Sequence, residues 1–88
     1  MTDGPTPEGT DLASWLEHLE RLLPTSAVAT MSAAEQALIL DLARIAARRS
    51  VRIAAPITTY AAGIASASLP AEVRVERLRE LIASLDTD

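Results

Sequence analysis

The sequence predicts an all-α fold, a compact bundle of about four helices in which a helix of small residues is central. Two observations support this. Apolar residues recur three and four positions apart in several segments, and helix start and stop signals bound those segments. No segment has the alternating pattern of a half-buried strand. The 88 residues suffice for one domain, predicted at 11–85, between a disordered tail at 1–10 and a frayed end at 86–88.

The first predicted helix begins after Asp11, whose side chain is suited to cap a helix N-terminus. It ends at Leu23, because Pro24 disfavours the helical conformation of the residue before it. Residues 24–30 are then expected to form a linker. The helix has one apolar stripe, formed by Leu12, Trp15, Leu16, Leu19, Leu22 and Leu23.

The second predicted helix has the clearest start in the chain. Ser32 and Glu35 have the spacing of a capping box, in which each side chain accepts a hydrogen bond from the other residue's backbone N–H. The apolar residues that follow are spaced to form one buried face: Leu38, Ile39, Leu42, Ile45 and Ala46.

A run without charged residues extends from Ile53 to Ala71, and its length matches the minimum for a membrane-spanning helix. Its composition argues against insertion, because it consists mainly of Ala, Ser, Thr, Gly and Pro rather than large apolar residues. We predict instead a third helix from Pro56 to about Ala67, since proline suits the first turn of a helix.

This third helix is predicted to be the central one, because a helix without charge on any face is buried on most sides. Gly63 lies within it and is expected to allow close approach of a neighbouring backbone, which would offset its low helix propensity. The residues expected to share one face are Ile57, Tyr60, Ala61 and Ile64.

The fourth predicted helix begins after Pro70. The other positions of this helix carry charges, including the i, i+3 pairs Glu76–Arg79 and Arg77–Glu80. Short connections favour antiparallel packing of successive helices. The apolar stripe consists of Ala71, Val75, Leu78, Leu81, Ile82 and Leu85.

Composition argues against several classes of function. A net charge of -4 and only two aromatic residues argue against nucleic-acid binding. The chain has no cysteine, and its one histidine, His18, has no second ligand at metal-binding spacing. No serine has a base to activate it, and no glycine-rich phosphate loop is present. We therefore expect no catalysis, no metal and no cofactor, and a cytoplasmic location, since the first ten residues lack the features of a signal peptide.

Arginines follow one another at i+4 spacing before the charge-free run, and they allow two interpretations. Arginine near a helix C-terminus complements the macrodipole, which is the ordinary structural role. Alternatively, these side chains and the first turn after Pro56 bind an anion, such as a phosphate or a partner's carboxylate. In this second interpretation, we expect loss of Arg52 to affect stability and anion binding more than loss of Arg48 or Arg49. The candidate residues are Arg44, Arg48, Arg52, Thr58, Thr59 and Tyr60.

The run "DLARIAARRSVRIAAPITTYAAGIA" at 41–65 resembles a small helical domain of unknown function found in bacteria, alone or attached to molybdenum cofactor guanylyltransferases. The family pattern has a histidine where this chain has Arg48 and a proline where it has Ile53, so any role of that histidine is lost here. The resemblance covers about residues 11–67. The matching residues are Asp41, Leu42, Ala43, Arg44, Ala47, Arg52, Ala54, Ala55, Pro56, Thr58, Thr59, Gly63 and Ala65, with Tyr60 in place of a phenylalanine.

Two functional hypotheses follow. The resemblance implies an accessory module near molybdopterin guanine dinucleotide synthesis, with a molybdenum cofactor guanylyltransferase or a molybdoenzyme as its protein partner. The arginines and the Thr58–Thr59 turn suggest instead a small anion- or nucleotide-binding domain. We favour the first, because a bundle of this size offers little concave volume for a ligand.

Overall fold

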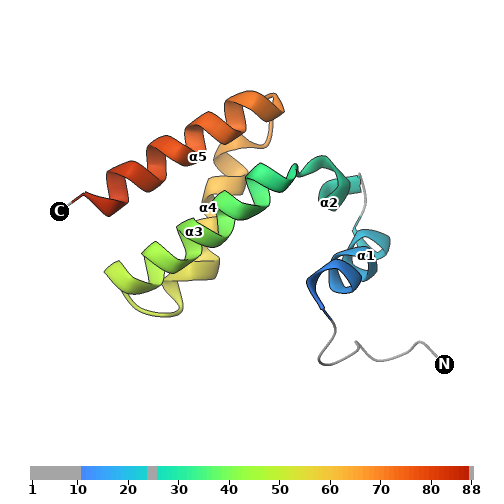
Figure 1. The fold of residues 1–88 in the computed structure, drawn as a ribbon, viewed down its shortest axis with the longest axis horizontal. Coiled ribbons are helices and arrows are strands. Elements are labelled where there is room, and N and C mark those ends of the chain that lie inside the picture. Colours follow the sequence, from blue (N-terminus) through green and yellow to red (C-terminus); the bar gives the residue numbers. More distant parts are fainter. Residues whose placement is uncertain (1–10, 24–25, 88) are drawn as a thin grey trace. The chain divides into compact units, whose positions relative to one another are not determined.

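The computed structural model describes residues 11–23 and 26–87, and all regular structure in these ranges is helical (Figure 1). The all-α prediction is therefore confirmed for this part of the chain, which has five helices rather than about four. The predicted disordered tail at 1–10 lies outside it. The helices are α1 (Leu12–Leu22), α2 (Ala27–Thr30), α3 (Ala33–Arg49), α4 (Ala54–Ser66) and α5 (Ala71–Asp86).

The contacts divide the chain into two compact units, Met1–Thr30 and Met31–Asp88. The first contains α1 and α2, and the second contains α3, α4 and α5. A single domain over 11–85 stays a prediction.

In the first unit, α1 has the predicted bounds to within one residue. The Asp11 side chain accepts a hydrogen bond from the Ser14 backbone N–H at 2.8 Å, as expected of an N-cap. The linker prediction was wrong for residues 27–30, which form the single turn α2. This turn has a local cause, because the Glu20 side chain accepts hydrogen bonds from the N–H groups of Val28 (2.8 Å) and Ala29 (3.2 Å).

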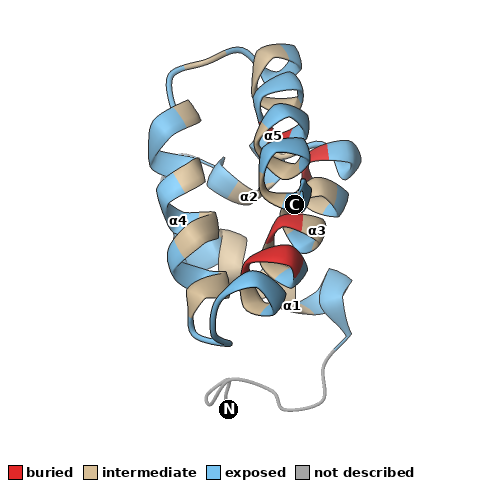
Figure 2. Cartoon of the chain, turned by 90° about the vertical axis from the view of Figure 1, so that its left-hand side faces the viewer, coloured by how far each residue is buried: buried red, intermediate tan, exposed pale blue. Residues whose placement is uncertain are grey.

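In the second unit, α3 is the helix on which the other two pack. Both halves of the capping box are present: the Glu35 N–H donates to Ser32 Oγ at 3.1 Å, and the Ser32 N–H donates to Glu35 Oε1 at 3.3 Å. Leu42, Ile45 and Ala46 are buried as predicted, with Leu42 fully inaccessible to solvent. Figure 2 shows the buried residues on α3 and α5 and none on α4.

Helices α3 and α5 run parallel and pack along their lengths, with Leu78 of α5 buried against α3. Their direction follows from two ion pairs. Glu35 at the start of α3 pairs with Arg74 near the start of α5, and Arg48 near the end of α3 pairs with Asp86 at the end of α5. The α5 helix extends one residue beyond its predicted end, where the Arg48 pair holds Asp86.

The prediction that the small-residue helix is central was wrong. Helix α4 packs on α3, makes few contacts with α5, and has no buried residue. Its half-buried positions are Ala54, Ala55, Thr58, Thr59, Ala62 and Ser66, which are all small. The lack of charge in α4 therefore does not reflect burial on several sides.

Gly63 does not have the predicted role. It is exposed, and a Cβ atom built on it would meet no atom within 4 Å. No neighbouring backbone therefore needs a glycine at this position in the isolated chain. The close packing of α4 on α3 uses a different side of the helix, where Ala55 and Ala62 lie.

Candidate interaction surfaces of the three-helix unit

The first candidate surface is the outward side of α4, which we call the α4 outer face. It consists of Ile53, Ile57, Tyr60 and Ile64, which are 69%, 66%, 74% and 64% exposed. Their spacing of four, three and four residues places them on one stripe of a helix. Three of these residues were predicted to share a buried face. They do share a face, but it is the exposed one, because α4 packs through its small side chains.

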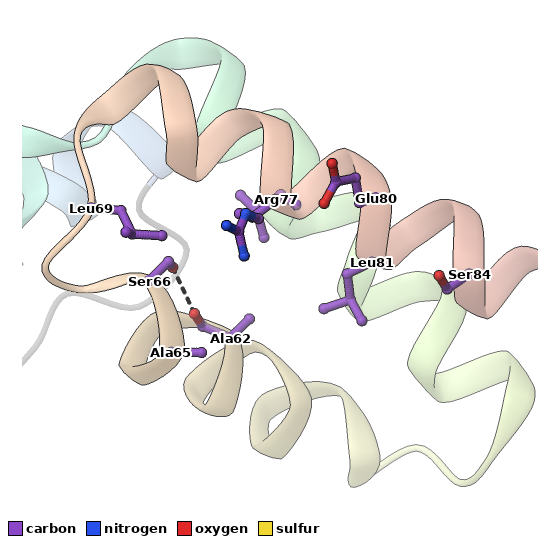
Figure 3. Close-up of a pocket in the computed structure, with 9 residues that line it drawn as sticks. Ala62, Ala65, Ser66, Leu69, Arg77, Glu80, Leu81 and Ser84 are labelled. Carbon is purple, nitrogen blue, oxygen red and sulfur yellow. Dashed lines mark hydrogen bonds between the residues drawn. The ribbon is translucent and has the colours of Figure 1, made fainter.

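The second candidate surface is the α4–α5 cleft, which opens because both helices pack on α3 and hardly on each other. It has two adjoining parts of about 300 and 520 Å³, which share Ala62, Ala65 and Leu81 as lining residues. The first part lies between α4 and α5 (Figure 3). The second also reaches α3, at Ala46 and Arg49.

The α4–α5 cleft is apolar along its walls and charged at one edge. Figure 3 shows Arg77 extending from α5 toward the α4 side, with Glu80 one turn further along α5. The predicted Arg77–Glu80 pair is not among the ion pairs of the described residues, whereas Arg79 and Glu76 approach to 4.0 Å. The guanidinium of Arg77 is therefore placed to meet a negative group that enters the cleft.

The three arginines at i+4 spacing, Arg44, Arg48 and Arg52, have different surroundings in the structure. Arg44 pairs with Asp41 of the same helix at 3.0 Å, and Arg48 pairs with Asp86 at 3.1 Å. Both pairs are largely exposed, so each contributes at most about 1 kcal/mol. Arg49 Nη2 donates to the carbonyl oxygen of Thr87 at 3.4 Å. Arg48 and Arg49 therefore hold the end of α3 at its junction with α5, whereas Arg44 is paired within α3.

Arg52 lies in the turn between α3 and α4, and its side chain makes no ion pair or hydrogen bond with the described residues. The start of α4 offers fewer backbone donors than predicted, since the helix begins at Ala54 rather than Pro56. The N–H groups of Ala54 and Ala55 donate to the carbonyls of Val51 and Arg52, and Pro56 has none.

Thr58, Thr59 and Tyr60 of the predicted anion site also have different surroundings. Thr59 Oγ1 donates to the carbonyls of Ala55 (3.2 Å) and Pro56 (3.1 Å), while Thr58 lines the α4–α5 cleft. Tyr60 lies on the α4 outer face. The six candidate residues thus occupy several surfaces, and an anion site among them stays a prediction.

An ion pair between Glu35 and Arg74 is the most buried polar contact of the described residues in this unit, and the helical patterns of the sequence did not predict it. Arg74 Nε lies 2.5 Å from Glu35 Oε2, and Arg74 Nη2 donates to Glu35 Oε1 at 2.8 Å. The two side chains are only 14% and 5% exposed. Arg74 Nη1 also donates to the carbonyl oxygen of Leu69 at 2.9 Å, which joins the α4–α5 connection to the pair.

Arg74 donates to both carboxylate oxygens of Glu35, and the pKa values of the two groups shift in the directions that this contact predicts. The hydrogen bonds from Arg74 lower the pKa of Glu35, opposed by burial, and the hydrogen bonds to Glu35 raise the pKa of Arg74. One signal in the sequence points to it, because Arg74 lies four residues before Leu78 and so falls within the buried stripe of α5. The pair has a structural role, since it holds α5 and the preceding turn against α3.

Residues 11–23 and 26–87 contain no cluster of three or more His, Cys, Asp or Glu side chains arranged to hold a metal ion. None of the helices in these ranges has the length and apolar character needed to cross a bilayer. His18 in α1 lies beside Trp15, with ring centroids 5.7 Å apart.

Comparison with known proteins identifies the family. The family model described as Domain of unknown function (DUF6457) matches residues 7–88. The chain belongs to the DUF6457 family. The match includes α5, so the family extends beyond residues 11–67, where the resemblance was expected to end. No curated protein and no solved structure matches the chain.

Proposed function

We propose that this DUF6457 protein is a non-catalytic interaction module that binds a helix of a partner protein in the α4–α5 cleft. The main support for this proposal is the α4–α5 cleft, which is apolar along its walls. The cleft is open because α4 and α5 both pack on α3 and hardly on each other. An amphipathic helix that enters such a groove buries its apolar face and completes a four-helix arrangement.

The charges at the cleft define the chemistry of the partner helix. Its apolar face meets Ala62, Ala65 and Leu81, and a carboxylate on its flank meets Arg77 at the edge. The expected partner segment is therefore a helix with an apolar stripe and acidic flanking residues.

We further propose that the partner is a molybdenum cofactor guanylyltransferase or a molybdoenzyme, in the cytoplasm. This finer assignment depends on the resemblance of residues 41–65 described above. The matching family is described as a domain of unknown function.

Affinity measurement with purified proteins tests both levels of the proposal. The guanylyltransferase and a molybdoenzyme of the same cell are immobilised, and binding of the chain is measured against the variant Ala65→Glu. Ala65 is exposed within the cleft, so glutamate there leaves the fold intact and places a negative charge where the acidic helix docks. We expect a loss of affinity of about tenfold or more.

Ala83→Glu is the matched control, because Ala83 is exposed on α5 and does not line the cleft. Equal binding by both variants would show that the cleft is not the docking site. No binding of either candidate enzyme by the parent chain would remove the molybdenum assignment. The cleft proposal would then be tested with partners captured by site-specific cross-linking at Ala65.

The second candidate function is binding of a phosphate or guanosine nucleotide, and one observation favours it. The Arg52 guanidinium has no ion-pair partner among the described residues. An anion that binds there raises the melting temperature of the parent chain and not that of Arg52→Ala. If phosphate and GTP leave the melting curve of the parent unchanged, this candidate is excluded.

A further inference from the structure

The α4 outer face lies on the opposite flank of α4 from the small residues that contact α3. Ile57 also lines the α4–α5 cleft, whereas Ile53, Tyr60 and Ile64 do not line it and have no role in the proposed function. Four large apolar residues on a single stripe are each at least 64% exposed, Ile53, Ile57, Tyr60 and Ile64. Apolar patches of this kind on small domains mark interaction sites. We propose that this face binds the same face of a second copy of the chain, with the two α4 helices antiparallel.

Charge favours a second copy as the occupant. The chain has a net charge of -4, so two copies repel each other over most of their surfaces. The segment from Ile53 to Ala71 contains no charged residue, and α4 lies within it. Contact through the α4 outer face therefore brings no like charges together. An acidic or basic partner, by contrast, would find no complementary charge on this stripe.

The available area also suits a dimer. The four side chains offer on the order of 500 Å² per copy, so that a pair buries roughly 1,000 Å², near the lower limit for specific interfaces. A face that pairs with itself about a two-fold axis needs no second complementary surface. The expected dimer is reversible, with a dissociation constant on the order of micromolar.

The antiparallel direction follows from the ends of α4. In that arrangement the two-fold axis passes between Ile57 and Tyr60, and Ile53 of one copy meets the partner's Ile64. Arg52, which has no ion-pair partner among the described residues, then lies beside the C-terminal end of the partner's α4, the negative end of its macrodipole.

Sedimentation of the full chain over a range of concentrations tests the association. The parent chain is expected to shift from monomer to dimer across the micromolar range. Ile64→Asp should weaken the dimer by tenfold or more, because it buries a charge in the interface, while the chain stays folded since Ile64 is exposed. Ala83→Asp on the exposed side of α5 adds the same charge elsewhere and should dimerise like the parent.

Cysteine cross-linking tests the direction, and the chain has no native cysteine to interfere. Ile53 and Ile64 are separated by roughly 16 Å along the helix, so a disulfide distinguishes the two orientations. Mixed Ile53→Cys and Ile64→Cys chains should cross-link, whereas each variant alone should not. Cross-linking of each variant with itself would show a parallel pair and overturn the proposal, as would a parent chain that stays monomeric at all concentrations. Neither result depends on partner binding in the α4–α5 cleft.

Discussion

Helices α3 and α4 belong to the same three-helix unit, yet they bury opposite kinds of side chain. Helix α3 buries large apolar residues, including Leu42 and Ile45, and exposes its arginines. Helix α4 turns alanine, threonine and serine toward α3 and exposes isoleucine and tyrosine. Periodicity therefore identifies the residues that share a face, but the face that turns inward depends on what each helix packs against.

The largest expected effect comes from breaking the buried pair that holds α5 on α3. Arg74→Met removes the partner of Glu35 and leaves a carboxylate that is 5% exposed without its hydrogen bonds. We expect the free energy of unfolding to fall by about 3–5 kcal/mol, as measured by urea denaturation. Arg79→Met is the control, since the Arg79–Glu76 pair is exposed and should contribute less than about 0.5 kcal/mol. Equal losses would mean that the pair is not structurally important.

Truncation of apolar side chains tests the contrast between the two helices directly. Leu42→Ala should cost about 2–5 kcal/mol, because Leu42 is fully buried on α3. Ile57→Ala should cost less than about 1 kcal/mol in the monomer, because Ile57 is 66% exposed on α4. Thermal melts at a concentration below dimer formation provide the measurement. A cost for Ile57→Ala close to that for Leu42→Ala would show that α4 is buried in solution.

Acidification should weaken the unit through Glu35. The pKa of Glu35 is lowered in the folded state, so its stabilising effect is complete above the ordinary glutamate pKa of 4.5 and is lost as the pH falls through the lowered folded-state pKa. Asp11, whose pKa is also lowered by the hydrogen bond from the Ser14 backbone N–H, caps α1 in the other unit and is exposed. The decline in stability between pH 5 and pH 2 should therefore be smaller in Glu35→Gln than in the parent chain. Parallel pH profiles for the two proteins would contradict the assignment.

The smallest effect concerns Gly63, and its sign is informative. Gly63→Ala should stabilise the monomer by about 0.5–1 kcal/mol, because a Cβ there meets no atom and alanine has the higher helix propensity. Loss of monomer stability would restore the expectation that α4 is closely approached within the chain.

The sequence alone predicts the structural features whose causes lie within a few neighbouring residues. The Asp11 cap, the Ser32–Glu35 capping box and the apolar stripe around Leu42 all depend on residues within one or two turns. The missed features depend on more distant partners. Helix α2 is capped by Glu20 from eight residues away, and Arg74 reaches Glu35 across 39 residues.

The candidate surfaces were only partly foreseeable for the same reason. The α4–α5 cleft exists because α3 and α5 run parallel, which leaves α4 on one side of that pair, and no local pattern encodes this arrangement. The exposure of Ile57, Tyr60 and Ile64 follows from it. The predicted arginine stripe was a correct helical pattern, but its members bind different elements once α5 is in place.

The Glu35 carboxylate takes part both in the N-terminal cap of α3 and in the packing of α5 on α3. Oε1 accepts hydrogen bonds both from the Ser32 N–H, at the first turn of α3, and from Arg74 of α5. The first turn of α3 and the docking of α5 therefore stabilise each other and should form and open as one cooperative step. Hydrogen exchange at the Ser32 amide would then report the detachment of α5 rather than simple fraying of a helix end.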